Sequence, residues 1–115
     1  MFPVTGDWTA TQAETYLAER RVPLRLSCRT PDGGLWMLSL WYLLRDGALH
    51  CATGANAEVV RYLRRDPGVA FEVSDNDPPY CGVRGAGTVS LSPDEDKTLL
   101  RGLMERYLGG TDSEL

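Results

Sequence analysis

Alternating apolar and polar positions mark most of the strands that this sequence predicts. Leu24, Leu26 and Cys28 alternate with basic or small polar side chains, and a second alternation covers residues 69–74. A third covers residues 82–91, where glycines indicate a bulge, tight curvature or the close approach of another backbone. Each stretch is therefore expected to bury one face.

The stretch from Leu35 to Leu44 differs from these because it carries large side chains on both faces. A tight turn at Asp46-Gly47 follows it, and residues 48–52 are predicted to return as its antiparallel neighbour. Such a run fits either a central strand or a strand whose outer face meets another subunit. Both interpretations stay open from the sequence.

Two helices are indicated by start and stop signals. The first is predicted to begin with the capping pattern Thr11-x-x-Glu14 and to end near Arg20. The second is predicted to follow the loop that ends in Asn56, whose side chain can cap it, and to stop before Pro67.

A third helix is predicted after the capping signals Ser92, Pro93 and Glu95. Its apolar stripe consists of Leu99, Leu100, Leu103, Met104 and Tyr107. Glycine at 109 and 110 ends it. Five strands and three helices, joined mostly by local hairpins, predict one α+β domain over residues 1–115, built on an antiparallel barrel.

Composition excludes several classes of function. The net charge of -4 argues against a nucleic-acid partner, which needs a basic surface. No apolar run approaches the roughly 20 residues that span a bilayer, and no secretory leader is evident, so we expect a soluble, cytoplasmic protein without membrane contact. A chain of 115 residues is small for enclosing a ligand unaided, so oligomerisation is expected.

The reactive side chains are few. Cys28, Cys51 and Cys81 are widely spaced and are predicted to be reduced thiols, with no metal site. Lys97 is the only lysine and lies in a charged run, which argues against Schiff-base chemistry. The single histidine, His50, is more easily explained by sheet packing than by catalysis. The sequence therefore identifies no catalytic residue.

The order of motifs in the middle of the chain is distinctive. An apolar strand containing Trp41-Tyr42 precedes the Asp-Gly turn, the next strand ends in Ala52-Thr53, and a helix closes with Leu-Arg-Arg-Asp-Pro at residues 63–67. This order resembles the FMN-binding split barrels related to pyridoxamine 5'-phosphate oxidase, from Val22 to about Tyr107. The resemblance implies a homodimeric, flavin-dependent oxidoreductase with an FMN groove at the subunit interface and an unidentified small-molecule substrate.

The resemblance also implies positions for the cofactor contacts. The backbone around Ser39, Leu40 and Trp41 is expected to face the flavin ring. The junction after residue 52 is expected to take the phosphate. There the resemblance implies contacts from Thr53, Asn56, Ala57 and Arg61.

This phosphate junction departs from the family's usual Ser-Arg-Lys. Ala57, Glu58 and Val59 stand there instead, so the phosphate loses two charge-assisted partners, each worth roughly 1.5–3 kcal/mol. The helix N-terminus, the Thr53 hydroxyl and Arg61 could compensate, as could Arg25 and Arg29 from the first strand. The alternatives are a dimeric binding module that has lost flavin, or a split barrel that uses deazaflavin or haem.

Two further expectations concern the tryptophans and the chain end. Trp36 and Trp41 are an odd number of residues apart on one predicted strand, so they are expected on opposite faces, in the core and in a dimer interface, or with Trp41 beside a ring-shaped ligand. Related chains continue past the last helix with a closing strand, whereas this sequence stops at Leu115. Either the sequence is truncated or the barrel lacks that strand, and an open edge needs a partner.

Overall fold

The computed structural model describes residues 3–109 of the chain. In chain order the elements are α1 (Ala10–Glu19), β1 (Leu24–Arg29), β2 (Leu35–Leu40), β3 (Tyr42–Arg45), β4 (Ala48–Cys51), α2 (Glu58–Arg65), β5 (Gly68–Ser74), β6 (Gly82–Thr88) and α3 (Thr98–Leu108). The predicted α+β class is thus confirmed, with one strand more than the five expected.

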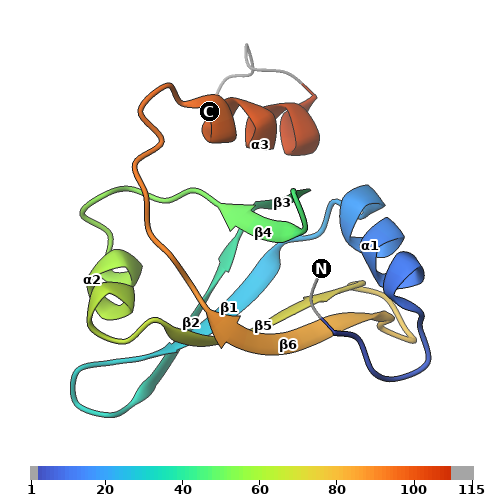
Figure 1. Cartoon of the computed structure of the whole chain (residues 1–115), viewed down its shortest axis with the longest axis horizontal. Coiled ribbons are helices and arrows are strands. Elements are labelled where there is room, and N and C mark those ends of the chain that lie inside the picture. Colours follow the sequence, from blue (N-terminus) through green and yellow to red (C-terminus); the bar gives the residue numbers. More distant parts are fainter. Residues whose placement is uncertain (1–2, 110–115) are drawn as a thin grey trace.

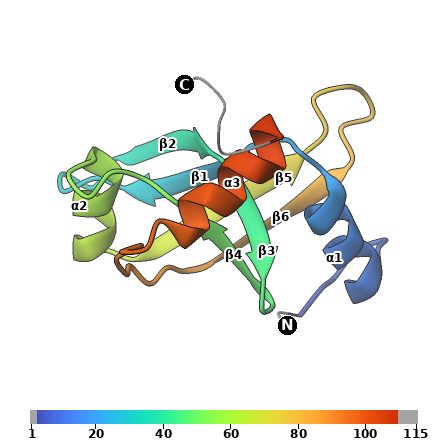
Figure 2. The ribbon, with the colours of Figure 1, turned by 90° about the horizontal axis from the view of Figure 1, so that it is seen from above.

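The strands form two antiparallel sheets. One has four strands in the order β2-β1-β5-β6, and the other is the β3-β4 hairpin. Figure 1 shows the hairpin above the larger sheet with α3 over it, and α1 and α2 on opposite sides. Viewed from above, α3 crosses the hairpin and the sheet diagonally (Figure 2). The arrangement is a barrel whose wall is split between two sheets.

The predicted long strand from Leu35 to Leu44 is wrong in one respect, because it breaks at Trp41. Leu40 pairs with Leu24 of β1, whereas Tyr42 pairs with Cys51 of β4, so the chain changes sheets at this residue. The expectation that Trp36 and Trp41 point to opposite faces of one strand therefore fails, since they do not share a strand.

The core lies on the inner face of the four-stranded sheet. It consists of Leu17, Leu24, Leu26, Cys28, Tyr42, Val59, Val60, Leu63 and Val73. The alternation predicted for residues 24–28 is confirmed, because β1 buries every second side chain. The hydroxyl of Tyr42 is buried as well and donates to the carbonyl of Leu17 at 2.8 Å, which satisfies its polar atom inside the core.

The first helix begins earlier than its predicted signal. Its capping box joins Thr9 and Gln12, in place of Thr11 and Glu14. The second helix starts where expected, but its N-cap is Ala57 rather than Asn56, and no side chain caps it.

The third helix starts later than predicted, at Thr98 instead of close to Ser92. The carboxylate of Asp94 accepts hydrogen bonds from the amides of Leu99 and Leu100 at 3.1 and 3.0 Å. These bonds hold the pKa of Asp94 below its ordinary value, the bond from Leu100 most of all. A carboxylate before the helix thus does the work that was predicted for a serine cap.

Strand β6 ends at Thr88, before the predicted end at Leu91. At its start, Gly82 lies so close to β5 that a Cβ atom would stand 2.3 Å from the carbonyl oxygen of Val73. The close backbone approach predicted from the glycines of this strand is therefore confirmed at Gly82.

The first and last helices are tied together by Arg106. Its guanidinium donates to the carbonyl oxygens of Leu17 and Ala18, at 3.0 and 2.6 Å, and to that of Arg20. It also lies over the ring of Tyr42, 4.8 Å from the ring centre. These carbonyls end α1, and helix ends favour positive charge.

Two predicted absences concern the membrane and the chain end. Within residues 3–109, no helix is both long and apolar enough to cross a bilayer. The prediction that a closing strand is missing concerns the chain after α3, where residues 110–115 lie outside the described residues, so it stays a prediction.

Candidate functional site

The sheet change at β2-β3 fixes the first three predicted cofactor residues. Ser39 is exposed, whereas Leu40 is partly buried and packs on the core. Trp41 stacks on Tyr107 of α3, with the ring centres 5.1 Å apart and the planes within 7°. One face of the indole is therefore already covered by the chain itself.

Tyr107 is held firmly in this position. Its hydroxyl donates to the carbonyl of Val22 at 2.9 Å and accepts from the amide of Tyr42 at 3.3 Å. The stacked pair thus docks α3 on the β2-β3 junction.

The predicted phosphate junction lies at the start of α2. Thr53, Asn56 and Arg61 are exposed there, and Ala57 is half-buried as the N-cap residue. The guanidinium of Arg61 lies 3.4 Å from the Glu58 carboxylate. Arg61 was expected to replace the basic side chains that this chain lacks. It is instead paired with Glu58, which stands at one of those basic positions.

The backbone at this helix start is nevertheless open. The amide of Ala57 donates to the carbonyl of Gly54, and the amides of Val60 and Arg61 donate to the carbonyl of Ala57. Since no side chain caps α2, the amides at its first positions still point outward with the positive end of the helix dipole. An anion can thus be bound by backbone alone.

One row of side chains crosses the outer face of the large sheet. The strand register places Ser39 of β2 opposite Arg25 of β1, Arg25 opposite Glu72 of β5, and Glu72 opposite Arg84 of β6. The structure therefore brings the predicted residues Ser39 and Arg25 together. Arg29, at the other end of β1, is not part of this row.

Arg29 instead pairs with the carboxylate of Asp66 at 3.4 Å, at the C-terminal end of α2. The backbone bond from Gly68, followed by the bond from Arg29, holds the pKa of Asp66 below its ordinary value. Arg29 therefore serves the α2-β5 corner and does not reach the helix start as the sequence had suggested.

The same outer face carries two exposed apolar side chains on β2. Leu35 is 79% exposed and Met37 is 62% exposed, and both share their face with Ser39 because side chains alternate along a strand. Strand β2 is also an edge of its sheet. Sequence reasoning noted an apolar run here without singling out these two residues, whose exposure follows only from the pairing register.

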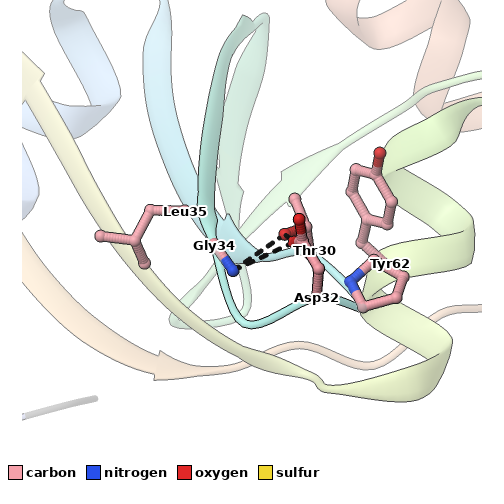
Figure 3. Close-up of a pocket in the computed structure, with 6 residues that line it drawn as sticks. Thr30, Asp32, Gly34, Leu35 and Tyr62 are labelled. Carbon is pink, nitrogen blue, oxygen red and sulfur yellow. Dashed lines mark hydrogen bonds between the residues drawn. The ribbon is translucent and has the colours of Figure 1, made fainter.

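A surface hollow with a volume of about 460 Å³ lies between the β1-β2 turn and Tyr62 of α2. In Figure 3 the polar atoms of this turn face one another: the Gly34 amide donates to Thr30 Oγ at 3.0 Å and to the Asp32 carboxylate at 3.2 Å. Leu35 points away. The hydrogen-bonding groups of the turn are thus already used.

A smaller hollow has a volume of about 270 Å³ and lies at the β5-β6 end of the sheet. Its lining includes Glu72, Ser74, Tyr80 and Arg84, so it overlaps the charged row on the outer face. Tyr80 belongs to the loop that joins the two strands and is 61% exposed.

The thiols offer little chemistry to this site. All three cysteines are free, in agreement with the predicted reduced state, and burial raises the pKa of Cys51 to about 12 and also raises that of Cys28. His50 lies in β4 opposite Leu43. In the described part of the chain, no group of His, Cys, Asp and Glu side chains is arranged to hold a metal ion.

Comparison with known proteins gives structural matches only. No protein-family model and no curated protein matches the chain. Among solved structures, it is similar to a conserved hypothetical protein of Mycobacterium tuberculosis, with 27% identity, coverage of 92% of this chain and 69% of that chain, and a TM-score of 0.79. It is also similar to an F420 reductase, with 27% identity, coverage of 85% and 78%, and a TM-score of 0.74.

More distant structures share the fold alone. An FAD-binding protein of Mesorhizobium loti is 19% identical, with coverage of 94% of this chain and 81% of that chain and a TM-score of 0.66. A haem-binding protein of Mycobacterium smegmatis is 20% identical, with coverage of 90% and 46% and a TM-score of 0.64. The chain therefore has the α+β split-barrel fold that its sequence predicted.

Proposed function

We propose that this chain is a flavin-type oxidoreductase subunit, which binds its cofactor at the β2-β3 junction and the start of α2 and acts on a small molecule. The observation that carries the proposal is the sheet change at Ser39-Leu40-Trp41, in a chain 27% identical to an F420 reductase. The cofactor supplies hydride or electron transfer, and the protein supplies binding and orientation.

The residues present fit a flavin-type group in part. Exposed Ser39 and partly exposed Trp41 offer contacts to a ring, and the free amides at the start of α2 offer an anion site. Glu58 opposes a dianion at the same place. FMN bound through basic side chains is thus the version of the proposal that the chain supports least.

Deazaflavin is a second candidate, and the likeness to an F420 reductase favours it. Haem binding is supported only by the shared fold of a haem-binding protein that is 20% identical to this chain. The alternative to all three cofactors is a chain that binds none of them. The Glu58–Arg61 pair favours this alternative, because it occupies the junction where the resembling family has free cations.

We further propose that two copies of the chain join through the outer face of the large sheet, which would put the cofactor groove at the interface. The exposed side chains of Leu35 and Met37 support this surface, because apolar side chains in contact with water gain from burial against a partner. Met37→Lys is expected to yield a monomer, measured by analytical ultracentrifugation, while Leu100→Lys on α3 is the matched control.

The test of cofactor binding is direct. The protein is mixed with FMN, FAD or F420 in turn and desalted, and the visible spectrum is recorded. Retention of one of these chromophores supports the proposal, and retention of none contradicts it.

A charge exchange sharpens the phosphate question. Glu58→Lys removes the opposing carboxylate and is expected to tighten FMN binding by about tenfold or more, because a charge-assisted contact replaces a repulsion. Glu95→Lys makes the same change of charge near α3 and should leave the affinity unchanged. If both variants bind FMN alike, the start of α2 is not the phosphate site.

A further inference from the structure

The charged row on the outer face ends in the smaller hollow, and its charges are not neutralised by one another. Glu72 stands between Arg25 and Arg84 in the strand register, yet within the described residues it forms an ion pair with neither. The partner recorded for its carboxylate is the hydroxyl of Ser74, at 3.2 Å. Opposite charges on directly facing positions ordinarily attract each other, so this arrangement is unusual.

The two arginines also lack strong charged partners. Arg25 donates to the side-chain oxygen of Asn76 at 3.3 Å, a long hydrogen bond to a neutral group. Arg84 has no ion-pair partner among residues 3–109. By contrast, Arg20 forms an ion pair with Asp75, the residue after β5, at 3.1 Å. Charged side chains near this hollow therefore do pair where their positions allow it.

The hollow between these groups adds an aromatic wall. Tyr80 lines it together with Glu72, Ser74 and Arg84. A protonated amine is attracted both by a carboxylate and by the face of a tyrosine ring, whereas a guanidinium binds a carboxylate through paired hydrogen bonds. The hollow therefore presents a site for one positive and one negative group side by side.

We infer that Glu72, Tyr80 and Arg84 form the substrate subsite of the proposed oxidoreductase, and that it takes a small amino-carboxylate. The amine lies between Glu72 and Tyr80, and the carboxylate lies on Arg84. This inference rests on the proposed function, because it assumes that the cofactor lies near Ser39.

The distances along the row agree with that assumption. Ser39 and Glu72 are separated by one intervening strand, and neighbouring strands lie about 4.8 Å apart, so the two Cα positions are about 10 Å apart. A small molecule on Glu72 and a ring over Ser39 would meet above Arg25. The substrate would therefore reach the cofactor without leaving the sheet face.

The experiment uses three probes with the same carbon chain. Amide signals of isotopically labelled protein are followed by NMR during titration with 4-aminobutanoate, butanoate and butylamine. We expect 4-aminobutanoate to shift the signals of Glu72 and Arg84, and each single-charge analogue to bind about tenfold more weakly, since each lacks one charge-assisted contact. Equal binding of all three probes, or no shift with 4-aminobutanoate, would overturn the inference.

Matched variants locate the binding. Glu72→Gln keeps the side-chain shape and removes its charge, Arg84→Gln removes the guanidinium, and each is expected to weaken 4-aminobutanoate binding by about tenfold. Arg101→Gln, on the exposed side of α3, should not change it. The spectra themselves report whether each variant is folded, and unchanged affinity in folded Glu72→Gln and Arg84→Gln contradicts the subsite.

Failure of this inference is distinct from failure of the proposed function. Cofactor retention is measured on the same samples by absorbance. Protein that keeps flavin but ignores 4-aminobutanoate contradicts the subsite alone. Protein that binds 4-aminobutanoate but retains no FMN, FAD or F420 leaves a binding site without the proposed redox chemistry, and it contradicts the role as a substrate subsite too.

Discussion

The two faces of the four-stranded sheet follow different rules. On the inner face, Leu26 and Val73 are buried in the hydrophobic core. On the outer face, Met37 is exposed, and Glu72 lies between two arginines without pairing with either. The inner face is explained by the stability of one folded chain. The outer face is not, which is why the proposed partner and substrate are both assigned to it.

The largest expected effect comes from truncating one side chain on each face. Leu26→Ala removes buried atoms and leaves a cavity, so it is expected to lower the free energy of unfolding by about 2–5 kcal/mol. Met37→Ala, on the opposite face, should cost under about 0.5 kcal/mol in a dilute, monomeric sample. Urea unfolding measures both.

This pair also reports on self-association. If Met37 is buried between two copies, the loss of unfolding free energy caused by Met37→Ala should grow with protein concentration in the same urea experiment. The loss caused by Leu26→Ala should not. Similar losses from both variants in dilute samples would remove the distinction between the faces.

The next effect concerns the backbone contact between β5 and β6. Gly82→Ala places a Cβ atom against the backbone of Val73, so we expect a loss of about 1–3 kcal/mol from forced displacement of the strands. Gly87→Ala is the control, because a Cβ atom there meets nothing within 4 Å. Thermal melting of both variants should show a clear loss for the first alone, and equal losses would contradict the close approach.

A smaller effect appears only at high pH. Burial raises the pKa of Cys51 from 9.0 to about 12, so between those values the unfolded chain gives up the thiol proton while the folded chain keeps it. The unfolded state then binds fewer protons, and the free energy of unfolding falls as the pH rises. Cys51→Ala should show a shallower decline than the natural chain across this range in urea titrations. Parallel declines would mean that the thiol is not buried.

The smallest expected effect is at the start of α3. Asp94→Ala removes the acceptor for two helix amides, so a modest fall in melting temperature is expected at neutral pH. Because the folded-state pKa of Asp94 is lowered, its contribution is present above the unfolded value and is lost as the pH falls through the folded one. Asp96→Ala removes a neighbouring charge as the control. An unchanged difference between the variants at low pH would contradict this assignment.

Much of the fold could be predicted because its signals are local. The alternation at residues 24–28 and the helix stop before Pro67 each depend on a few neighbouring side chains, and the structure agrees with both. The break at Trp41 could not be predicted, since Leu40 and Tyr42 look alike in an apolar run and differ only in their partner strands. Pairing is a long-range choice that a local pattern does not record.

The site was less accessible to sequence reasoning for the same reason. Arg25 and Arg29 look equivalent on one strand, yet one faces Ser39 and the other is bound to Asp66. Glu72 and Arg84 were not selected at all, because their importance lies in facing each other across β5 and β6. Their charge pattern becomes visible only once the register is known.

The hydrogen bonds from Arg106 to the end of α1 form only after α3 has packed against the rest of the chain. The carbonyl groups that end α1 obtain this donor from a residue 88 positions away from Ala18. A nascent chain that has formed both sheets but has not yet released α3 still lacks this contact and the stacking partner of Trp41. Such separation in sequence slows folding. Helix α3 thus completes the hydrogen bonding at the end of α1, and α1 is expected to exchange its amide hydrogens readily until α3 has packed.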